Sequence, residues 1–229
     1  MSFAEFWQHF AADIWPQLVQ ALGETLYMTI PSVILAYLVG LPLGVLLVIT
    51  RKGGVKPMPV FNMVLGAVIN FLRPIPFLIL LALLAPATRA LVGIAFGEPK
   101  AVIFPLFISA FPYVARMTEG SFNEVDGGVV EAAQSMGSTT MQIIAKVLIP
   151  EAMPSLVNGV AICTVTILGY TTMASAVGGG GLGSLAIIYG LNLRRYDVMY
   201  SASILLVILV QIITVLGTFL TRKVDHRIR

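Results

Sequence analysis

The chain has 229 residues, of which 58% are hydrophobic and only 11% are charged. A soluble domain carries about a quarter charged residues, so this composition excludes an ordinary water-soluble protein and indicates a membrane-embedded one. The net charge is +3, but no basic patch with interleaved aromatic residues occurs, so nucleic-acid binding is not indicated. The single cysteine, Cys163, lies in an apolar run and is expected to be a small buried side chain.

Residues 1–21 combine aromatic and polar side chains at helical spacing. Phe6, Trp7 and Phe10 alternate here with acidic residues such as Glu5 and Asp13. The pattern is typical of an amphipathic helix that lies at a membrane interface, where aromatic rings are enriched. An extension packed on the rest of the protein fits the pattern equally well. The segment has no basic start, so we do not expect a cleaved signal peptide.

Five hydrophobic segments follow, each long enough to cross a bilayer, which takes roughly 20 apolar residues as a helix. The predicted spans are residues 22–50, 59–86, 101–121, 156–177 and 199–220. The second span is interrupted at Arg73-Pro74-Ile75-Pro76, and the fourth ends in four consecutive glycines at 178–181. We therefore expect an all-α membrane protein. Its transmembrane domain covers residues 22–221, with a loop at 123–152 and a basic tail at 222–229.

The distribution of Lys and Arg predicts the orientation in the membrane. With the N-terminus outside, nine of these residues lie on the cytoplasmic side: Arg51, Lys52, Lys56, Arg116, Lys146, Arg222, Lys223, Arg227 and Arg229. Four lie outside: Arg89, Lys100, Arg194 and Arg195. Because basic residues concentrate on the cytoplasmic side, we expect an external N-terminus, a cytoplasmic C-terminus and a cytoplasmic 123–152 loop.

The loop between the third and fourth spans contains the half-polar stretch EAAQSMGSTTMQIIAKVLIP, residues 131–150. It predicts two short helices. The first covers about residues 129–136 and ends at Gly137, which is free to take the left-handed conformation that closes a helix. Thr139 and Gln142 form a possible capping box for the second helix. Pro150 is expected to end that helix, since proline cannot donate a backbone hydrogen bond.

The second of these helices has an apolar stripe. Met141, Ile144, Ala145 and Leu148 recur at the spacing of one helix face. A helix of about ten residues is marginal alone in water, so it needs a surface to pack on. That surface is either the membrane and the protein's own spans or a cleft in a separate cytoplasmic protein. In the first helix Ala132 and Ala133 are small, so another surface can approach closely.

The same stretch resembles the EAA motif of bacterial binding-protein-dependent ABC importer permeases. Glu131-Ala132-Ala133, then Gly137, then Val147-Leu148-Ile149-Pro150 match its spacing, with Val and Ile at two positions where the motif has Ile and Leu. In that family the loop is the coupling helix, which lies in a groove of the ATP-hydrolysing subunit. The resemblance implies that the following residues couple this chain to an ATPase: Glu131, Ala132, Ala133, Gly137, Met141, Ile144, Leu148 and Pro150.

Four more stretches resemble the permease subunit of methionine importers, which has the type I ABC importer permease fold. They are GLPLGVLLVITR (40–51), NFLRPIPFLILL (70–81), FPYVARMTEG (111–120) and GYTTMASAVGGGGLG (169–183). The resemblance covers nearly the whole chain from about residue 22. It implies transport of L- or D-methionine across the bacterial inner membrane. The implied assembly is a homodimer of this chain with two ABC ATPase subunits and a periplasmic or lipid-anchored methionine-binding protein.

The same resemblance implies that this chain is not an enzyme and holds no cofactor, because ATP and Mg belong to the partner ATPase. One alternative is an ABC permease for another amino acid. Another is a self-powered secondary transporter or channel, but such carriers usually place acidic residues within their spans. The only histidines, His9 and His226, lie near opposite ends of the chain, which argues against a zinc site or a histidine-dependent protease.

Three residues are candidates for the translocation pathway. Arg73 is the only charge deep in a predicted span, and a charge at the centre of a span costs ~2.5–3.5 kcal/mol by insertion scales. It either bonds carbonyls freed by the neighbouring prolines or lines the pathway. By resemblance, Met173 helps to close the pathway at the twofold axis, and Tyr170 lies nearby in sequence.

Two other polar features have plain structural interpretations. The four glycines at 178–181 and Gly183 lack the lysine of a phosphate-binding loop, so we expect a tight turn or hinge. Arg116 and Glu119 are spaced to pair on one helix, and we expect an ion pair near a helix end rather than a proton relay.

Overall fold

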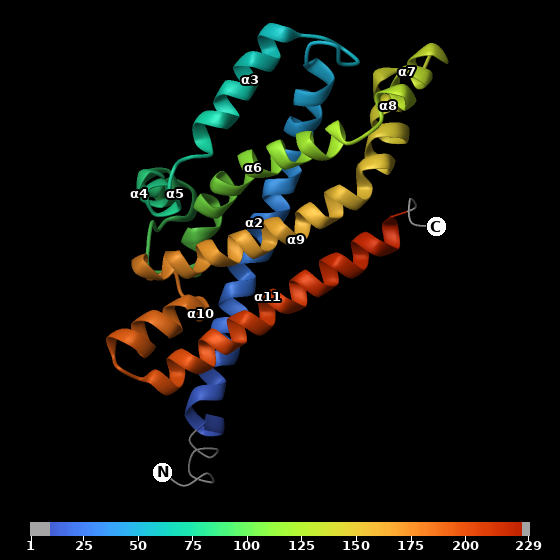
Figure 1. Cartoon of the computed structure of the whole chain (residues 1–229). Helices are drawn as coiled ribbons and strands as arrows, with labels where there is room; N and C mark the ends of the chain where they lie inside the picture. Colours follow the sequence, from blue (N-terminus) through green and yellow to red (C-terminus); the bar gives the residue numbers. More distant parts are fainter. Residues whose placement is uncertain (1–9, 226–229) are drawn as a thin grey trace. The chain divides into compact units, whose positions relative to one another are not determined.

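The computed structural model describes residues 10–225. The first nine residues of the predicted interfacial segment, the last four of the basic tail, and both histidines lie outside this range. Among the described residues every regular element is a helix, as Figure 1 shows, and this confirms the all-α prediction.

The helices follow one another with short connections. In chain order they are η1 (Phe10–Ile14), α2 (Trp15–Thr50), α3 (Pro59–Leu72), α4 (Phe77–Leu83), α5 (Ala85–Val92), α6 (Pro99–Asn123), α7 (Gly127–Ser135), α8 (Thr140–Ile143), η2 (Ile144–Leu148), α9 (Ile149–Ala174), η3 (Ser175–Val177), α10 (Gly181–Ser184), η4 (Leu185–Asn192) and α11 (Tyr196–Val224).

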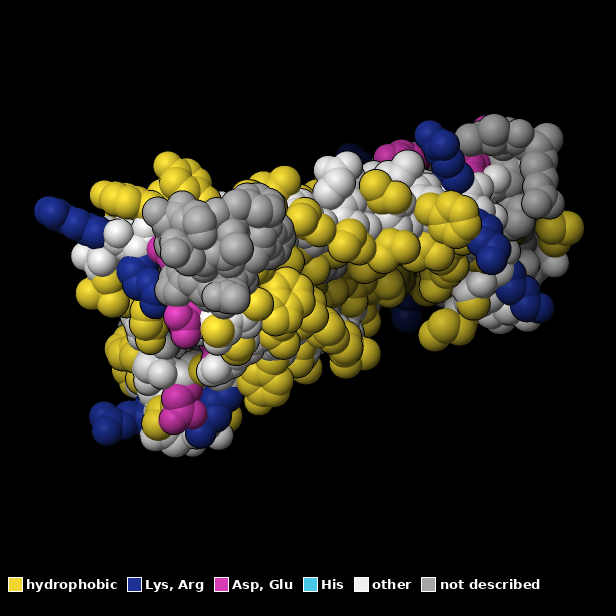
Figure 2. All heavy atoms as spheres, turned by 90° about the horizontal axis from the view of Figure 1, so that it is seen from below, with side chains coloured by type: hydrophobic (Ala, Val, Ile, Leu, Met, Phe, Trp, Pro, Cys, Tyr) yellow, Lys and Arg dark blue, Asp and Glu magenta, His cyan; other side chains and the backbone are white. Residues whose placement is uncertain are grey.

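Four stretches of continuous helix in the described chain are long and apolar enough to cross a membrane. They are Phe10–Thr50, Pro99–Asn123, Thr140–Val177 and Tyr196–Val224. The pair Pro59–Leu72 and Phe77–Leu83 makes a fifth if it counts as one interrupted span. The predicted interruption at residues 73–76 is therefore confirmed. Hydrophobic side chains also make up most of the surface seen in Figure 2, as expected for a protein that contacts lipid.

The described residues fall into two compact units, each built from three separate parts of the chain. Unit 1 takes residues 10–32, 76–107 and 164–212, and unit 2 takes residues 33–75, 108–163 and 213–225. The hydrophobic core of unit 1 joins the start of α2 to α10, η4 and α11. Its buried members are Ile14, Leu18, Ala21, Leu182, Leu185, Val198 and Ala202.

The core of unit 2 joins α2 and α6 to the segment between α6 and α9. Its buried members are Val45, Val48, Ile49, Phe122, Val125, Ala133, Ile143, Ile144, Leu148, Ala152 and Leu156. Cys163, also in unit 2, is 1% exposed, which confirms the sequence prediction that it is buried.

Helices also occur outside the predicted spans. Helix α2 begins at Trp15, so the helix passes without a break through the boundary predicted at residues 21 and 22. Residues 85–92 and 181–192, which lie mostly between the predicted spans, also form helices. The apolar run from Leu182 to Leu191 is too short to cross a bilayer, and runs of this length are more often core or re-entrant helices.

Candidate coupling site

The EAA segment begins with helix α7, whose two ends are fixed by local hydrogen bonds. At the start, the Asp126 carboxylate accepts from the Gly128 N–H at 2.7 Å. At the end, Gly137 has a φ of +78°, and its N–H donates to the Gln134 carbonyl at 2.9 Å. The Ser138 N–H donates to the Ala133 carbonyl at 3.1 Å, which completes a Schellman motif. The predicted end of the first helix at Gly137 is confirmed.

The second helix of the segment starts with the predicted capping box. The Thr139 N–H donates to Gln142 Oε1 at 2.8 Å, and the Gln142 N–H donates to Thr139 Oγ1 at 3.4 Å. The predicted end of this helix at Pro150 is wrong, because α8 continues through η2 into α9. In η2 the Ile149 N–H donates to the Ile144 carbonyl five residues back. The wide turn changes the hydrogen-bond register just before Pro150, so the missing N–H of proline falls at the first turn of α9.

The predicted apolar stripe of the second helix is only half buried. Ile144 and Leu148 are buried in the core of unit 2 together with Ile143, which the stripe did not include. Met141 is 70% exposed, and Ala145 is also exposed. The helix therefore packs on its own protein through two members of the stripe and leaves the other two uncovered.

The eight residues assigned to coupling divide in the same way. Ala133, Ile144 and Leu148 are buried. Glu131, Ala132, Gly137, Met141 and Pro150 are exposed. Figure 1 shows α7 and α8 side by side next to the start of α9. The two helices form a hairpin. Its buried side chains pack against the rest of unit 2, and the five exposed residues lie on its surface.

The exposed surface of the hairpin has a distinct chemistry. Met136, which was not among the predicted coupling residues, is 79% exposed. The hairpin therefore exposes one methionine before Gly137, Met136, and one after it, Met141. The side chain of Glu131 makes no hydrogen bond or ion pair within the described residues, and it is exposed. Exposed methionines are adaptable contacts for a partner surface, and Glu131 adds a charge to that contact. No cluster of His, Cys, Asp or Glu in residues 10–225 fits a metal ion.

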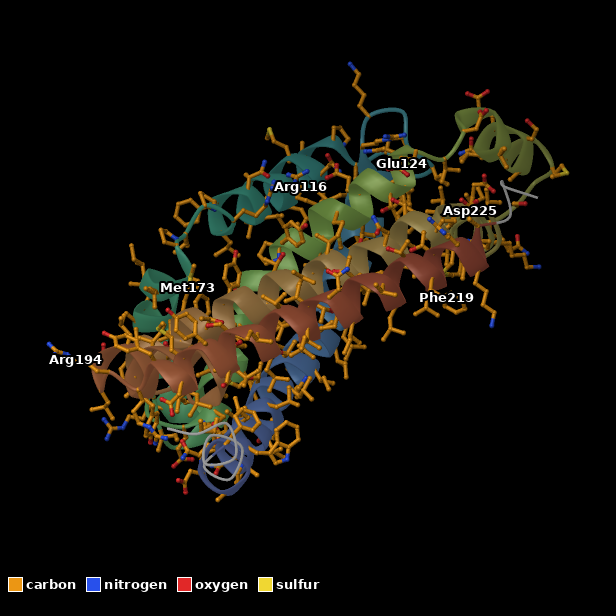
Figure 3. All side chains as sticks on the ribbon, turned by 60° about the horizontal axis from the view of Figure 1, so that its bottom comes forward. Arg116, Glu124, Met173, Arg194, Phe219 and Asp225 are labelled. Atoms are coloured by element: carbon orange, nitrogen blue, oxygen red, sulfur yellow. The ribbon has the colours of Figure 1, made fainter. Side chains whose placement is uncertain are left out.

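Of the three candidate pathway residues, Arg73 belongs to unit 2, and Tyr170 and Met173 lie on α9 in unit 1. Arg73 caps the end of α3, where it is exposed and makes no hydrogen bond or ion pair within the described chain. In unit 1 Tyr170 stacks on Phe77, with ring centroids 5.1 Å apart and an angle of 5° between the rings. Met173, labelled in Figure 3, lies one turn further along α9 and is 49% exposed.

Arg116 forms the predicted pair with Glu119, with Nη1 2.5 Å from the carboxylate. It also binds α3, which the sequence analysis missed. Its Nη2 donates to the Gly66 carbonyl at 3.0 Å, and its Nε donates to Asn70 Oδ1 at 3.1 Å. Figure 3 shows Arg116 on the side of α6 next to α3. The pair is therefore part of a link between two helices of unit 2.

A family model described as "Binding-protein-dependent transport system inner membrane component" matches residues 40–229. A protein of Vibrio cholerae named "Probable D-methionine transport system permease protein MetI" is 46% identical over 229 residues, which cover 99% of this chain and 100% of the relative. The "Methionine import system permease protein MetP" of Bacillus subtilis is 44% identical, and the match covers 92% of this chain and 95% of the relative.

A solved structure titled "Inward facing conformations of the MetNI methionine ABC transporter" contains a chain similar to this one throughout. The TM-score is 0.89 and the sequence identity 40%, and the match covers 99% of this chain and 100% of the other. At that coverage the likeness includes the EAA hairpin as well as the spanning helices.

Proposed function

Because the chain belongs to the family of binding-protein-dependent transport system inner membrane components, we propose that it is the permease subunit of an ATP-driven methionine importer in the bacterial inner membrane. The observation that carries this proposal is the similarity, over nearly the full length, to proteins named for methionine transport. The structure supports it with a partly buried, partly exposed hairpin at the position of the EAA motif.

The proposed assembly pairs two copies of this chain with two ATPase subunits and a methionine-binding protein on the outer side. ATP and Mg bind to the ATPase subunits, and this chain catalyses no reaction. Closure of the ATPases on ATP pulls the two hairpins together and favours an outward-open arrangement of the helices. Hydrolysis then restores the inward-open arrangement. ATP binding supplies the free-energy difference between the two arrangements.

The hairpin has the construction that such a linkage requires. Glu131, Met141 and the other exposed residues provide the contact with the ATPase. The buried residues Ile144 and Leu148 pack against α2 and α6 in the core of unit 2. A force applied to the exposed side therefore reaches spanning helices through packed side chains, because a close-packed core transmits displacement.

The first experiment reconstitutes the chain in liposomes with its ATPase and binding protein and follows labelled methionine. We expect uptake that requires ATP and all three components. Uptake by this chain alone would support a self-powered carrier instead. Competition by unlabelled amino acids then tests the substrate: stronger competition by an amino acid other than methionine contradicts the methionine assignment.

The second experiment tests the hairpin as the contact. Glu131→Lys reverses an exposed charge, and we expect it to abolish co-purification of the ATPase while the permease still inserts. Glu98→Lys reverses another exposed charge far from the hairpin in sequence and serves as the control.

Gly137→Ala places a Cβ at a left-handed residue, which costs about 1 kcal/mol, and we expect it to weaken the complex with the ATPase. Gly120→Ala, where a Cβ has open space, should not.

A further inference from the structure

Helix α2 contains one charged residue. Of the 36 residues from Trp15 to Thr50 only Glu24 is charged, and it lies in unit 1. A carboxylate within so apolar a helix is costly unless hydrogen-bond donors surround it. The structure supplies two: the Gly181 N–H donates to Oε2 at 2.7 Å, and Gln20 Nε2 donates to Oε1 at 3.0 Å.

The next residue, Thr25, accepts a hydrogen bond from the same turn. Thr25 Oγ1 accepts from the Leu182 N–H at 2.9 Å, and its own proton goes to the Ala21 carbonyl at 2.9 Å. The hydroxyl is therefore oriented to accept. Thr25 is 1% exposed and Leu182 is fully buried, so water cannot replace this bond.

These two bonds cap the helix that runs from Gly181 to Asn192. The first four N–H groups of a helix have no partner within it, and a side chain just before the helix usually supplies one. Here the preceding residue is Gly180, which has no side chain. Glu24 and Thr25, 157 positions earlier in the chain, take that role, and the negative charge of Glu24 suits the positive end of the helix.

The glycines of this turn are required for the contact. Gly180 and Gly181 have φ values of +77° and +76°. A Cβ at Gly180 would lie 2.7 Å from Glu24 Oε2, and one at Gly181 would lie 2.7 Å from Thr25 Oγ1. Any side chain at either position would displace the capping pair.

The capped turn is also joined to the end of α9. The Gly179 N–H donates to the Ala174 carbonyl at 3.0 Å. The N–H of Gly97, which lies between α5 and α6, donates to the Val177 carbonyl at 3.1 Å. Ala174 follows Met173 directly. Figure 1 shows the α10 region beside the first part of α2, in agreement with the two hydrogen bonds.

We propose that Glu24 and Thr25 are positioning residues for transport: they cap the Gly181–Asn192 helix from α2 and so hold the end of α9 that carries Met173. This role rests on the proposed transport function. A cavity of about 510 Å³ borders Glu24 on the side of Gln17, Gln20 and Arg195, so this half of the cap has room to open. Thr25 anchors the buried half.

The first test measures the cap itself by hydrogen exchange of residues 178–192 in the assembled complex. Thr25→Val removes the acceptor at constant shape, and we expect roughly 2- to 10-fold faster exchange, the effect of losing one buried hydrogen bond. Glu24→Ala should act similarly. The controls are Thr29→Val, whose hydroxyl bonds only to its own helix at Thr25, and Glu98→Ala. Equal exchange in Thr25→Val and wild type overturns the cap.

The second test measures ATP hydrolysed per methionine imported. If the cap positions α9, Thr25→Val and Glu24→Ala should raise this ratio roughly 2- to 5-fold. ATP hydrolysis would continue in these variants, but the end of α9 that carries Met173 would no longer be held in place, so fewer cycles would import methionine. Thr25→Ser, which restores the acceptor, should return it to the wild-type value. A purely structural role would instead reduce the amount of complex and leave the ratio unchanged, and that result overturns the proposal.

The two tests separate this proposal from the proposed function. If the wild-type complex imports no methionine with ATP, the proposed function is wrong. The hydrogen-exchange measurement still tests whether Glu24 and Thr25 cap the Gly181–Asn192 helix. If Thr25→Val does not assemble, Glu24→Ala at the half-exposed end of the cap gives the same comparison. Normal exchange and a normal ratio in Glu24→Ala would then reject the role.

Discussion

Arg116 illustrates how a charged residue is accommodated in an apolar helix. Its three donors reach a carboxylate, a side-chain amide and a backbone carbonyl, and the side chain is 22% exposed. The carbonyl belongs to Gly66, where a Cβ would lie 3.1 Å from Nη2. The absence of a side chain at residue 66 therefore leaves room for the guanidinium beside the backbone of α3. Arginine suits this position because its planar group serves several acceptors at once.

We expect Arg116→Ala to destabilise the assembled protein by about 1–3 kcal/mol, since Asn70 and Glu119 lose their charged partner. Thermal unfolding in detergent measures this. Arg89→Ala is the matched control, because Arg89 makes no side-chain bond within residues 10–225 and should change the midpoint little. A midpoint for Arg116→Ala equal to that of the control would show that the link to α3 contributes nothing.

Arg73 differs from Arg116 because it has no partner within the described chain. The prediction that neighbouring carbonyls bind it finds no support in the structure, so a role in the pathway is the interpretation to test. We expect Arg73→Ala to lower methionine uptake at least several-fold while the amount of complex recovered in detergent stays the same. Arg73→Lys keeps the charge and should retain part of the uptake. A matching loss of assembled complex would instead indicate a structural role.

At the scale of the elements, the contact between α2 and α6 in unit 2 depends on two small residues one turn apart. A Cβ at Gly40 would lie 2.7 Å from the Phe111 carbonyl, and one at Gly44 would lie 2.6 Å from the Ala115 carbonyl. Small residues four apart let helix backbones approach closely in membranes, where packing rather than the hydrophobic effect drives association. This contact explains why both positions in the GLPLG stretch are glycine. From the sequence alone, the stretch indicated only a resemblance to methionine importer permeases.

Gly44→Ala should therefore destabilise the protein by about 1–3 kcal/mol, because the new Cβ would lie 2.5 Å from Thr118 Cβ and 2.6 Å from the Ala115 carbonyl, and neither atom can move without moving α6. Gly23→Ala is a control in the same helix, since a Cβ there has open space, and we expect no loss. Both midpoints come from thermal unfolding of the purified complex. A Gly44→Ala protein as stable as Gly23→Ala would mean that the two helices separate easily.

At the scale of the whole molecule, the distribution of basic residues remains the basis for the orientation. From these residues we predict that the hairpin lies on the cytoplasmic side. Cys163 is buried, so replacing it with Ala gives a background for labelling introduced cysteines. We expect Glu98→Cys to react with a membrane-impermeant maleimide on intact cells and Gln134→Cys to react only after permeabilisation. Labelling of Gln134→Cys on intact cells would reverse the orientation and contradict the coupling role.

The features that depend on local chemistry could be predicted from the amino-acid sequence. The helical class, the spans, the interruption at residues 73–76, the glycine that ends α7 and the Thr139–Gln142 capping box all follow from residues close together in the chain. Those residues choose their conformation through nearby backbone bonds, so periodicity and capping patterns are enough to predict them.

Which side chains face outward and which distant residues meet could not be predicted, because both depend on how the whole chain packs. Met141 and Leu148 lie on one predicted stripe, yet one is exposed and the other buried, because the surface that covers a short helix is built from other parts of the chain. Pro150 continues a helix because a wide turn precedes it. The cap of Gly181 by Glu24 joins residues 157 positions apart, and no local pattern encodes a contact whose partner is brought close only by packing.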